Sequence, residues 1–456
     1  MRYDEKLDLY LKKKTHLYQN FDVVRREVGL GLKKGVLYYL SSLVNEVAIT
    51  NLLEGIKVAW SASTMEKTLF NGSVLKKTNQ EEILDDFFSG NAILLLENLK
   101  SAMVIDVRSY PSRAISEPTS EQTIRGSRDG FTESINTNVG LIRRRIKDTH
   151  LMIETFNVSK KSAISVAVCY LSDQADLGIV EDLKKKIQEI DVNSLVMSDR
   201  ALEEIIFKQR FSPFPLVRYT ERPDVASINL MNGKILLICD TSASVIITPT
   251  TFIDHTKHVE EFRQSPLIGS FTRLLRSIAV LLSFLLLPLW LALVKTDGFH
   301  NGLEIEVTLQ NSHLLVVQIF VAELIFELLR IASIHTPSQL TSAVGLIAAI
   351  VLSQVSLDLG LFLPEIILMC AISAICGFAT PSYELSMANK VMKLILILFV
   401  AVGGKVGFLI GITLLYIYLS CLKTWDMPYL YPFCPLDTKK ALNLFSRSSA
   451  KKRKNL

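Results

Sequence analysis

The distribution of charge along the chain constrains its fold more than any other feature. Only thirteen of residues 277–422 are Asp, Glu, Lys or Arg, although the chain of 456 residues carries 50 basic and 45 acidic residues in all. A stretch so poor in charge is what the hydrocarbon of a bilayer requires. We therefore expect a soluble N-terminal region followed by an all-α polytopic transmembrane domain over 273–422.

Apolar runs within this region predict the individual helices. They cover residues 277–294, 313–332, 340–357, 361–379, 391–402 and 408–422, and the last two are separated by Gly403-Gly404-Lys405-Val406-Gly407. We expect about six crossings, with the glycine-rich turn as the last external bend. Four crossings with re-entrant segments are the alternative, because 391–402 is short for a span of about 20 residues.

Basic residues predict the orientation. Lys and Arg gather before the first run, around Lys390 and Lys393, and in the basic tail 423–456, whereas the loops after 294 and 357 are acidic or nearly uncharged. Positive charge is retained on the cytoplasmic side of membranes, so both termini are expected there. The first thirty residues carry charge throughout and lack the apolar core of a signal peptide, so we expect no export of the N-terminus.

The soluble region contains two segments that resemble one another. Tyr39-Leu40-Ser41 and Tyr170-Leu171-Ser172 end the expected strands 36–40 and 164–171, and GNAILLLENLKSAMVI from Gly90 resembles GKILLICDTSASVII from Gly233. We expect two similar α/β subdomains, 1–116 and 152–272, on either side of a connecting segment, 117–151. Two unrelated α/β domains are the alternative. Residues 1–34 are expected to form a charged helical lead-in, with Val24 and Val28 at helical spacing.

The connecting segment 117–151 predicts a helix that starts near Phe131. Its apolar residues recur at helical spacing and form one stripe, namely Ile135, Val139, Ile142 and Ile146. The arginines fall largely off this stripe, where they are available to carboxylates of another domain or subunit. We expect a docking role, with binding of an anion or a lipid headgroup as the alternative. The interface candidates are Arg143, Arg144, Arg145, Asn136 and Asn138.

Three charged residues lie inside the second apolar run. Glu323 and Glu327 are four residues apart, which places them on one face of a helix, and Arg330 follows three residues later. A charge in hydrocarbon costs at least about 2.5 kcal/mol, so this face must contact protein or water. We interpret all three as candidates for an ion path. An internal pair that locks helices together and a helix lying at the membrane interface are the alternatives.

Enzymatic and metal-binding motifs are absent from the sequence. It contains no GxxxxGK[ST], GxSxG or HExxH, its seven histidines are isolated, and its six cysteines include no CxxC pair. We therefore expect no catalytic residue, no metal and no cofactor. The formal charge of +5 is modest and the basic clusters lack interleaved aromatic residues, so nucleic acid is not expected as a partner.

Several motifs carry a family resemblance. The stretch IRGSRDGFTESINTNVGLIRRRIKDTHL closely resembles the signature of the A subunits of spore germinant receptors, a family of Bacillus and Clostridium membrane proteins. The resemblance continues through SPFP from Ser212, YTERPD from Tyr219, ATPSY from Ala379 and PYLYPF from Pro428. Three more stretches point to one branch of that family, namely EEFRQSPLIGSF from Glu260, IHTPSQLTSAVGLIAA from Ile334 and FATPSYELSMAN from Phe378.

The resemblance implies a location and a function. It implies a multi-pass protein of the dormant spore's inner membrane, with its N-terminal domains and both termini on the spore-core side. Its implied partners are further copies of itself in a ring-like homo-oligomer, germinant receptor subunits or a small membrane partner, and the lipid bilayer. The expected function is an oligomeric ion channel or channel-like subunit that promotes ion release during germination. A non-conducting scaffold that organises germinant receptors is the alternative.

Overall fold

The computed structural model places most of the chain in two compact units. The first comprises Met1–Arg210 and Val217–Pro249, and the second comprises Phe211–Leu216 and Thr250–Leu456. The structure describes residues 5–30, 33–58, 74–97, 99, 101–110, 121, 123, 125–159, 164–193, 195, 197–207, 212–297, 312–335, 345–347, 350, 354, 356–438, 440 and 441. Most of the predicted run 340–357 and the basic residues 442–456 lie outside the described residues.

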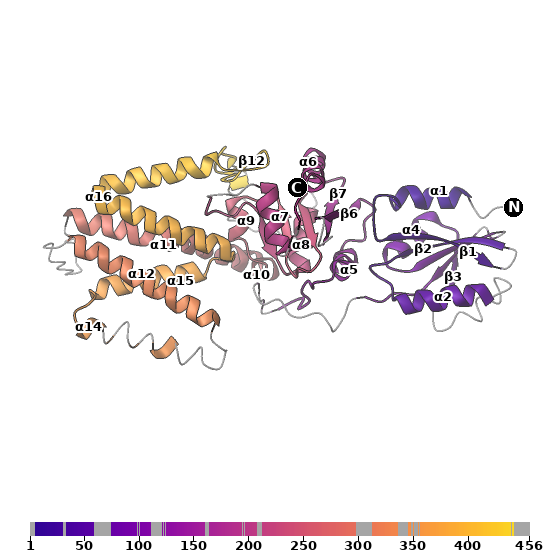
Figure 1. Cartoon of the computed structure of the whole chain (residues 1–456), viewed down its shortest axis with the longest axis horizontal. Helices are drawn as coiled ribbons and strands as arrows, with labels where there is room; N and C mark the ends of the chain where they lie inside the picture. Colours follow the sequence, from indigo (N-terminus) through magenta and orange to yellow (C-terminus); the bar gives the residue numbers. More distant parts are fainter. Residues whose placement is uncertain are drawn as a thin grey trace. The chain divides into compact units, whose positions relative to one another are not determined.

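The first unit begins with a five-stranded antiparallel sheet of order β1-β2-β4-β5-β3. The elements of this repeat are α1 (Glu5–Lys14), β1 (Val23–Leu30), β2 (Lys33–Leu40), α2 (Glu46–Val58), β3 (Val74–Lys77), α4 (Gln80–Phe88), β4 (Ala92–Leu96) and β5 (Ala102–Ile105). Side chains alternate between the two faces of a strand, so Tyr38 packs in one buried cluster and Leu37 in the other. Helices α1 and α4 cover the first face and α2 covers the second (Figure 1).

The predicted helical lead-in over residues 1–34 is wrong in its second half. Residues 5–14 are helical, but Val23–Leu30 is strand β1 and pairs with β2 along its whole length, from Val23 opposite Leu40 to Leu30 opposite Lys33. Val24 and Val28 are four residues apart and imitate a helical stripe. Pairing with the neighbouring strand overrides that local pattern, and β-branched valines suit a strand.

A second sheet in the same unit has the order β6-β7-β9-β10-β8 and is also antiparallel. Its elements are α5 (Ile135–Arg145), β6 (Leu151–Val158), β7 (Ile164–Leu171), α6 (Leu177–Gln188), α7 (Ser198–Phe207), β8 (Arg218–Thr220), α8 (Pro223–Met231), β9 (Ile235–Cys239) and β10 (Val245–Thr248). The strand order of the first sheet therefore recurs, which confirms the two similar α/β subdomains.

The two sheets agree residue by residue in their register. Tyr38 lies opposite Ile93 in the first sheet, and Cys169 lies opposite Leu236 in the second. A shift of 131 relates β2 to β7, and a shift of 143 relates β4 to β9 throughout the paired residues. The same shift of 143 carries α4 onto α8. Such agreement identifies a duplicated unit.

Helix α5 is the counterpart of α1. Each precedes the first hairpin of its sheet and packs against the corresponding helix, α1 against α4 and α5 against α8. The helix begins at Ile135 after the N-cap Ser134, later than the predicted start near Phe131, which is buried in the preceding loop. The connecting segment 117–151, called the signature segment below, thus opens the second repeat as well as connecting the two repeats.

The second unit is mainly helical. It contains α9 (Phe252–Thr256), α10 (Glu260–Arg263), α11 (Pro266–Asp297), α12 (Ser312–His335), α14 (Ser356–Asp358), α15 (Pro364–Phe378) and α16 (Tyr383–Cys421), followed by the short strands β11 (Lys423–Thr424) and β12 (Met427–Pro428). Among the described helices, α11 and α16 are long and apolar enough to cross a membrane. The fold class is confirmed, whereas six crossings remain a prediction.

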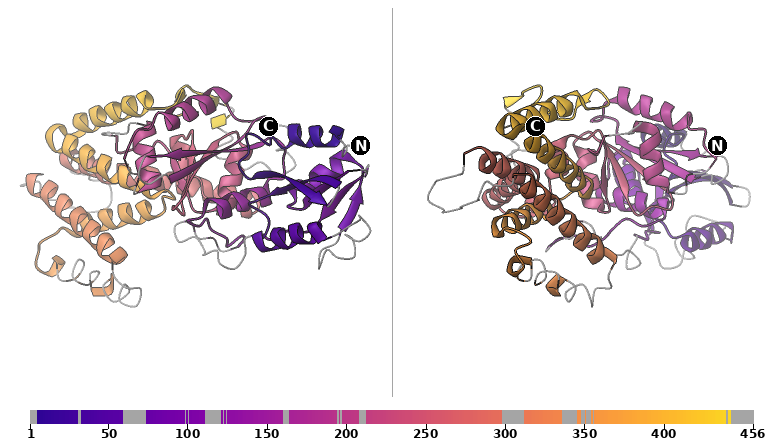
Figure 2. Two further views of the ribbon diagram at one scale, coloured as in Figure 1. Left: turned by 45° about the vertical axis from the view of Figure 1, so that its right-hand side comes forward. Right: turned by 60° about the vertical axis from the view of Figure 1, so that its left-hand side comes forward.

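Helix α16 turns back on itself at the predicted glycine-rich interruption. Gly404 has φ 54° and ψ −132°, which is not helical, and the chain doubles back there into two arms (Figure 2). The arms approach closely at Gly407, where an added Cβ atom would clash with the carbonyl oxygen of Phe399. The glycines therefore permit a turn that a larger residue would obstruct.

Candidate functional site

Two glutamates and two lysines pair inside the helical unit. Glu323 Oε2 lies 2.6 Å from Lys393 Nζ, and Glu327 Oε2 pairs with Lys390 Nζ. Glu323 and Glu327 are one turn apart on α12, and Lys390 and Lys393 are one turn apart on the first arm of α16. The two pairs therefore form consecutive cross-links between these helices.

Arg330 extends the charged cluster by one turn of α12. Its Nε donates to Glu327 Oε1 at 3.0 Å, and its guanidinium carbon lies 5.2 Å from the centre of the Tyr383 ring. Glu327 thus accepts hydrogen bonds from Arg330 on its own helix and from Lys390 on α16. Two cations, Arg330 and Lys390, therefore share the single carboxylate of Glu327.

Hydroxyl and amide groups connect the cluster to α11 and α15. Lys393 Nζ donates to Ser373 Oγ at 3.1 Å, and Ser373 Oγ donates to the Ser283 carbonyl at 2.9 Å. Asn389 Nδ2 donates to Ser283 Oγ at 3.3 Å. Ser283, Ser373, Asn389 and Lys393 are all at most 5% exposed. Four helices are consequently joined by polar contacts in a unit that is otherwise apolar.

A cavity of about 40 Å³ lies beside these groups. Glu323, Glu327, Lys390 and Lys393 line it together with Ser373. The Oε1 atom of Glu323 is buried and has no hydrogen-bond partner among the described residues. Because a buried acceptor without a partner is unfavourable by roughly 1–3 kcal/mol, this oxygen requires water or another donor in the cavity.

The structure brings together all three candidates for an ion path, Glu323, Glu327 and Arg330. Sequence reasoning did not assign Lys390 and Lys393 to this cluster. It interpreted them as charges that gather at the membrane surface, but both lie inside α16 and pair with the glutamates. Lys390 and Lys393 are three residues apart and Glu323 and Glu327 are four apart, about one helical turn in each case. This matching spacing is the sequence signal that could have predicted the two ion pairs.

The interface candidate Arg143 is fully buried within the first unit. Its Nε and Nη2 donate to the two carboxylate oxygens of Asp22, each at 3.0 Å, and its Nη1 donates to the Leu151 carbonyl at 3.2 Å. Ser42 Oγ also donates to Asp22, at 2.9 Å. Arg143 therefore joins the signature helix to the first repeat.

The other interface candidates have different surroundings. Arg144 is exposed and its guanidinium lies 5.0 Å from the centre of the Tyr110 ring, whereas Arg145 donates to Asp129 at 2.7 Å. Asn138 is buried and braces the loop before α5, because it accepts from Thr132 N at 2.7 Å and donates to Thr132 O at 2.6 Å. Asn136 is exposed.

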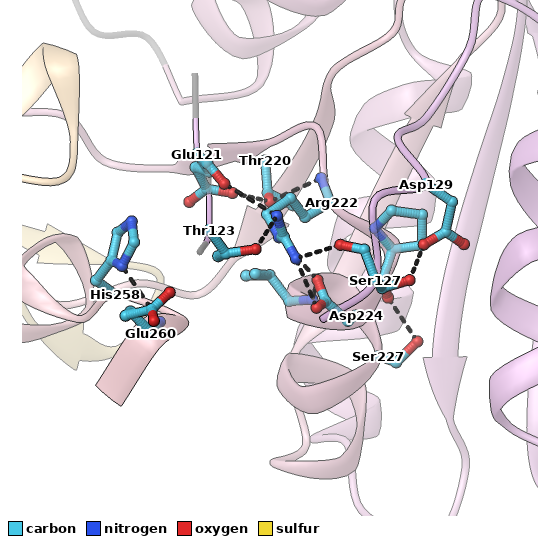
Figure 3. A network of polar contacts seen from close by, with 12 residues as sticks. Glu121, Thr123, Ser127, Asp129, Thr220, Arg222, Asp224, Ser227, His258 and Glu260 are labelled. Carbon is cyan, nitrogen blue, oxygen red and sulfur yellow. Dashed lines mark hydrogen bonds and ion pairs between the residues drawn. The ribbon is translucent and has the colours of Figure 1, made fainter. Parts of the chain in front are cut away.

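Arg222, which belongs to the YTERPD stretch from Tyr219, organises a second polar network. Figure 3 shows its guanidinium among residues of the signature segment, where it donates to Glu121 O at 3.0 Å and to Ser127 O at 2.9 Å. It also forms an ion pair with Asp224 at 2.9 Å. Glu121 in turn accepts from Arg218 at 2.9 Å. The network fixes the start of the signature segment to β8 and α8.

These contacts in the first unit satisfy their charges internally, which indicates a structural role. The cluster in the second unit has an unsatisfied carboxylate oxygen and a cavity, which makes it the candidate functional site. Among the described residues, no group of three or more His, Cys, Asp or Glu side chains is arranged to hold a metal ion.

Comparison with known proteins identifies relatives along nearly the whole chain. Stage V sporulation protein AF of Bacillus subtilis (strain 168) is 40% identical over 96% of this chain and 91% of its own. Spore germination protein KA of the same organism is 28% identical over 93% of this chain and 81% of its own. The AF relative belongs to the branch that the three quoted stretches indicated.

A solved structure also matches the chain. It is the N-terminal domain of the A subunit of the Bacillus megaterium spore germinant receptor GerK3, at 24% identity and a TM-score of 0.40, with 54% of this chain and 94% of that chain covered. The model of the Bacillus/Clostridium GerA spore germination protein family matches residues 10–455. The chain therefore belongs to the GerA family of spore germination proteins.

Proposed function

We propose that this GerA-family membrane protein is an oligomeric ion channel or channel-like subunit that promotes ion release during spore germination. It resides in the spore inner membrane as a multi-pass protein, with both termini on the spore-core side. Copies of the chain form a ring-like homo-oligomer, and germinant receptor subunits or a small membrane partner bind to it.

The charged cluster of α12 and α16 carries this proposal. Ionisable residues in membrane-spanning segments are expensive and commonly mark paths for ions or protons. Replacing a buried ion pair by apolar residues is often neutral or stabilising, so stability alone gives little reason for Glu323 and Lys393 to occupy an apolar unit. A role in the passage of charge, or in its control, gives such a reason.

Removal of the two carboxylate charges tests the proposal. The double variant Glu323→Gln with Glu327→Gln retains side-chain size and one acceptor oxygen on each side chain, and we expect it to change the rate of potassium release from germinating spores. Protein level and oligomer size should remain those of the wild type. Wild-type release rates in this variant would remove the cluster from the ion path.

A matched control is available in the same unit. Glu365 lies in the first turn of α15 and does not line the cavity. A carboxylate there interacts favourably with the helix dipole, so Glu365→Gln should leave ion release unchanged. Equal effects of the two substitutions would indicate a general response to lost charge.

A non-conducting scaffold that organises germinant receptors is the second candidate. The observation in its favour is that Glu327 is paired with cations of its own chain on both sides. Such pairs serve to join helices without conducting anything. Purified protein in potassium-loaded liposomes distinguishes the two functions, because absence of potassium flux together with capture of receptor subunits would favour the scaffold.

A further inference from the structure

Four helices change from polar to apolar at the same level of the helical unit. The polar residues on this level are Ser283 of α11, Glu323 of α12, Ser373 of α15 and Lys393 of α16. Roughly one turn further along each helix, on one side, the corresponding residues are Leu287, Ile319, Cys370 and Ile397, each fully buried in one apolar cluster. The polar contacts therefore end at a common boundary.

The apolar side of this boundary is closed. We call it the apolar layer, and it consists of buried residues of the same four helices, namely Leu287, Trp290, Leu291, Ile319, Ala322, Ile366, Cys370, Ile397 and Val400. Their exposed fractions run from 0% to 8%. Closely packed apolar side chains of this kind exclude water from between them. Next to Ile319, the buried Oε1 atom of Gln318 has no hydrogen-bond partner among the described residues.

The polar side opens gradually toward one end of the unit. The Lys393 and Glu323 side chains are 3% and 12% exposed, whereas those of Lys390 and Glu327, one turn away, are 23% and 24% exposed. The next residues in that direction are Ser386, at the start of α16, and Gly377, at the end of α15, and both line the same cavity. Helix ends surround the opening, so it faces the end of the unit.

The groups at the closed end suit water. A water molecule needs about 10–15 Å³ of accessible volume and two to four polar partners, so a cavity of about 40 Å³ has room for about three. Glu323 Oε1 requires a donor, and the Lys393 ammonium has one hydrogen beyond those given to Glu323 and Ser373. Water supplies both a donor and an acceptor. A metal cation would meet the Lys393 charge directly.

We infer that each copy of the chain contains a water-filled vestibule that is open at one end and closed by the apolar layer at the Glu323–Lys393 pair. The vestibule is a property of the single chain and holds whether or not the protein conducts. Ions that cross the membrane do not pass along this vestibule unless the apolar layer opens.

Reactivity of cysteines toward silver ions tests the vestibule, because a silver ion can follow a path wide enough for water. The full-length protein would carry Ala at Cys370, Cys376, Cys421 and Cys434 and keep the buried Cys169 and Cys239 of the first unit as a constant background, with one further cysteine introduced at a time. The reporters are Ser386→Cys near the opening and Ser373→Cys at the closed end, and the controls are Ile397→Cys and Val400→Cys in the apolar layer. Silver-protected thiols are counted by mass spectrometry after denaturation and alkylation.

Ser386→Cys and Ser373→Cys should both be protected, with the first reacting faster, and Ile397→Cys and Val400→Cys should react at least tenfold more slowly than Ser373→Cys. The Ser→Cys changes are nearly isosteric, and an unchanged elution volume shows that the oligomer is intact. Protection of Val400→Cys at the rate of Ser373→Cys would overturn the apolar closure. A Ser373→Cys thiol as slow as Val400→Cys would overturn the water-filled vestibule.

Discussion

Two buried ion pairs, one in each unit, solve the same physical problem differently. Asp22 and Arg143 are both 0% exposed, and Asp22 uses both carboxylate oxygens, which accept from Arg143 and Ser42. Glu323 uses one oxygen for Lys393, and its other oxygen is buried without a partner among the described residues. The Glu323 side chain also lines a cavity. The first pair is saturated by protein, and the second depends on something that the protein does not supply.

The chemistry of the two cations explains the difference. The guanidinium of arginine is planar and matches both oxygens of a carboxylate at once. The ammonium of lysine is a compact and strongly hydrated charge on a flexible stem. Arg143 is therefore suited to a dry, rigid connection, whereas Lys393 is suited to a site that exchanges water. The comparison separates a structural pair from a candidate functional one.

Removal of Arg143 should have the largest effect. Arg143→Met leaves Asp22 buried without its counter-charge, and breaking a buried pair on one side is unfavourable by about 3–5 kcal/mol. Hydrogen exchange of full-length protein, followed by mass spectrometry of peptides from β1, α5 and β6, measures the loss. A loss below about 1 kcal/mol would show that water reaches Asp22 and would break the comparison.

Removal of Lys393 should lower the free energy of unfolding by less than removal of Arg143, although the Glu323–Lys393 pair lies in an apolar unit. Lys393→Met leaves Glu323 with cavity water, so we expect a loss of about 1–3 kcal/mol, typical of one unsatisfied polar group. Thermal unfolding followed by tryptophan fluorescence reports this loss, because Trp290 is 8% exposed in the adjoining apolar cluster. Lys423→Met, at an exposed position in β11, serves as the control. A loss equal to that of Arg143→Met would indicate a dry cavity.

Acid should weaken the signature segment at Asp129. Burial raises the pKa of Asp129, but hydrogen bonds from Arg145 and Ser127 outweigh burial and hold the pKa below its ordinary value of 3.8. A lowered pKa in the folded state gives stability that is present above the unfolded value and is lost as the pH falls through the folded pKa. Proteolysis of residues 125–134 should therefore accelerate below about pH 4.

The Asp129→Asn variant isolates this contribution from those of other acidic residues. It should be cleaved faster than the wild type at neutral pH, with a smaller further increase on acidification. The same acid response in both proteins would assign the effect to another carboxylate, such as Asp8, whose pKa is also held below its ordinary value. Burial raises the pKa of Asp8, and hydrogen bonds from Arg25 and Lys12 lower it further than burial raises it.

Arg144→Ala should have the smallest effect. Arg144 is exposed, and its contact with the Tyr110 ring resembles other exposed cation–π contacts, which contribute about 0.5–1 kcal/mol. The hydrogen-exchange measurement used for Arg143→Met applies here too, and the adjacent positions make the two variants a matched pair. A loss of several kcal/mol for Arg144→Ala would mean that position along α5, and not saturation of the pair, determines the cost.

Local patterns predicted the parts of the fold that depend on local interactions. The two similar stretches from Gly90 and Gly233 both form hairpins, β4 with β5 and β9 with β10, and their apolar runs and short turns are complete within each segment. Strand β1 was not predicted, because Arg25, Arg26 and Glu27 interrupt its apolar character and because its extended conformation depends on pairing with β2. The duplication was indicated by a few short stretches of similar sequence, and the matching registers of β2 with β4 and of β7 with β9 established it.

Only the acidic member of each ion pair in the candidate site was predictable from the sequence. Glu323 and Glu327 stand out because apolar residues surround them in the sequence, but the sequence does not show which cation each one contacts. Arg143 was expected off the apolar stripe of α5, and it is buried because the first repeat covers that side of the helix. Pairings between distant segments arise from tertiary packing, which periodicity does not report.

The contact between Asp22 and Arg143 also has a consequence for biosynthesis. The two residues are 121 positions apart, and all strands of the first repeat precede Arg143 in the chain. Proteins generally fold from the N-terminus during synthesis, so the first repeat leaves the ribosome complete in its strands but without the partner of Asp22. Its final, dry form has to wait for the opening helix of the second repeat.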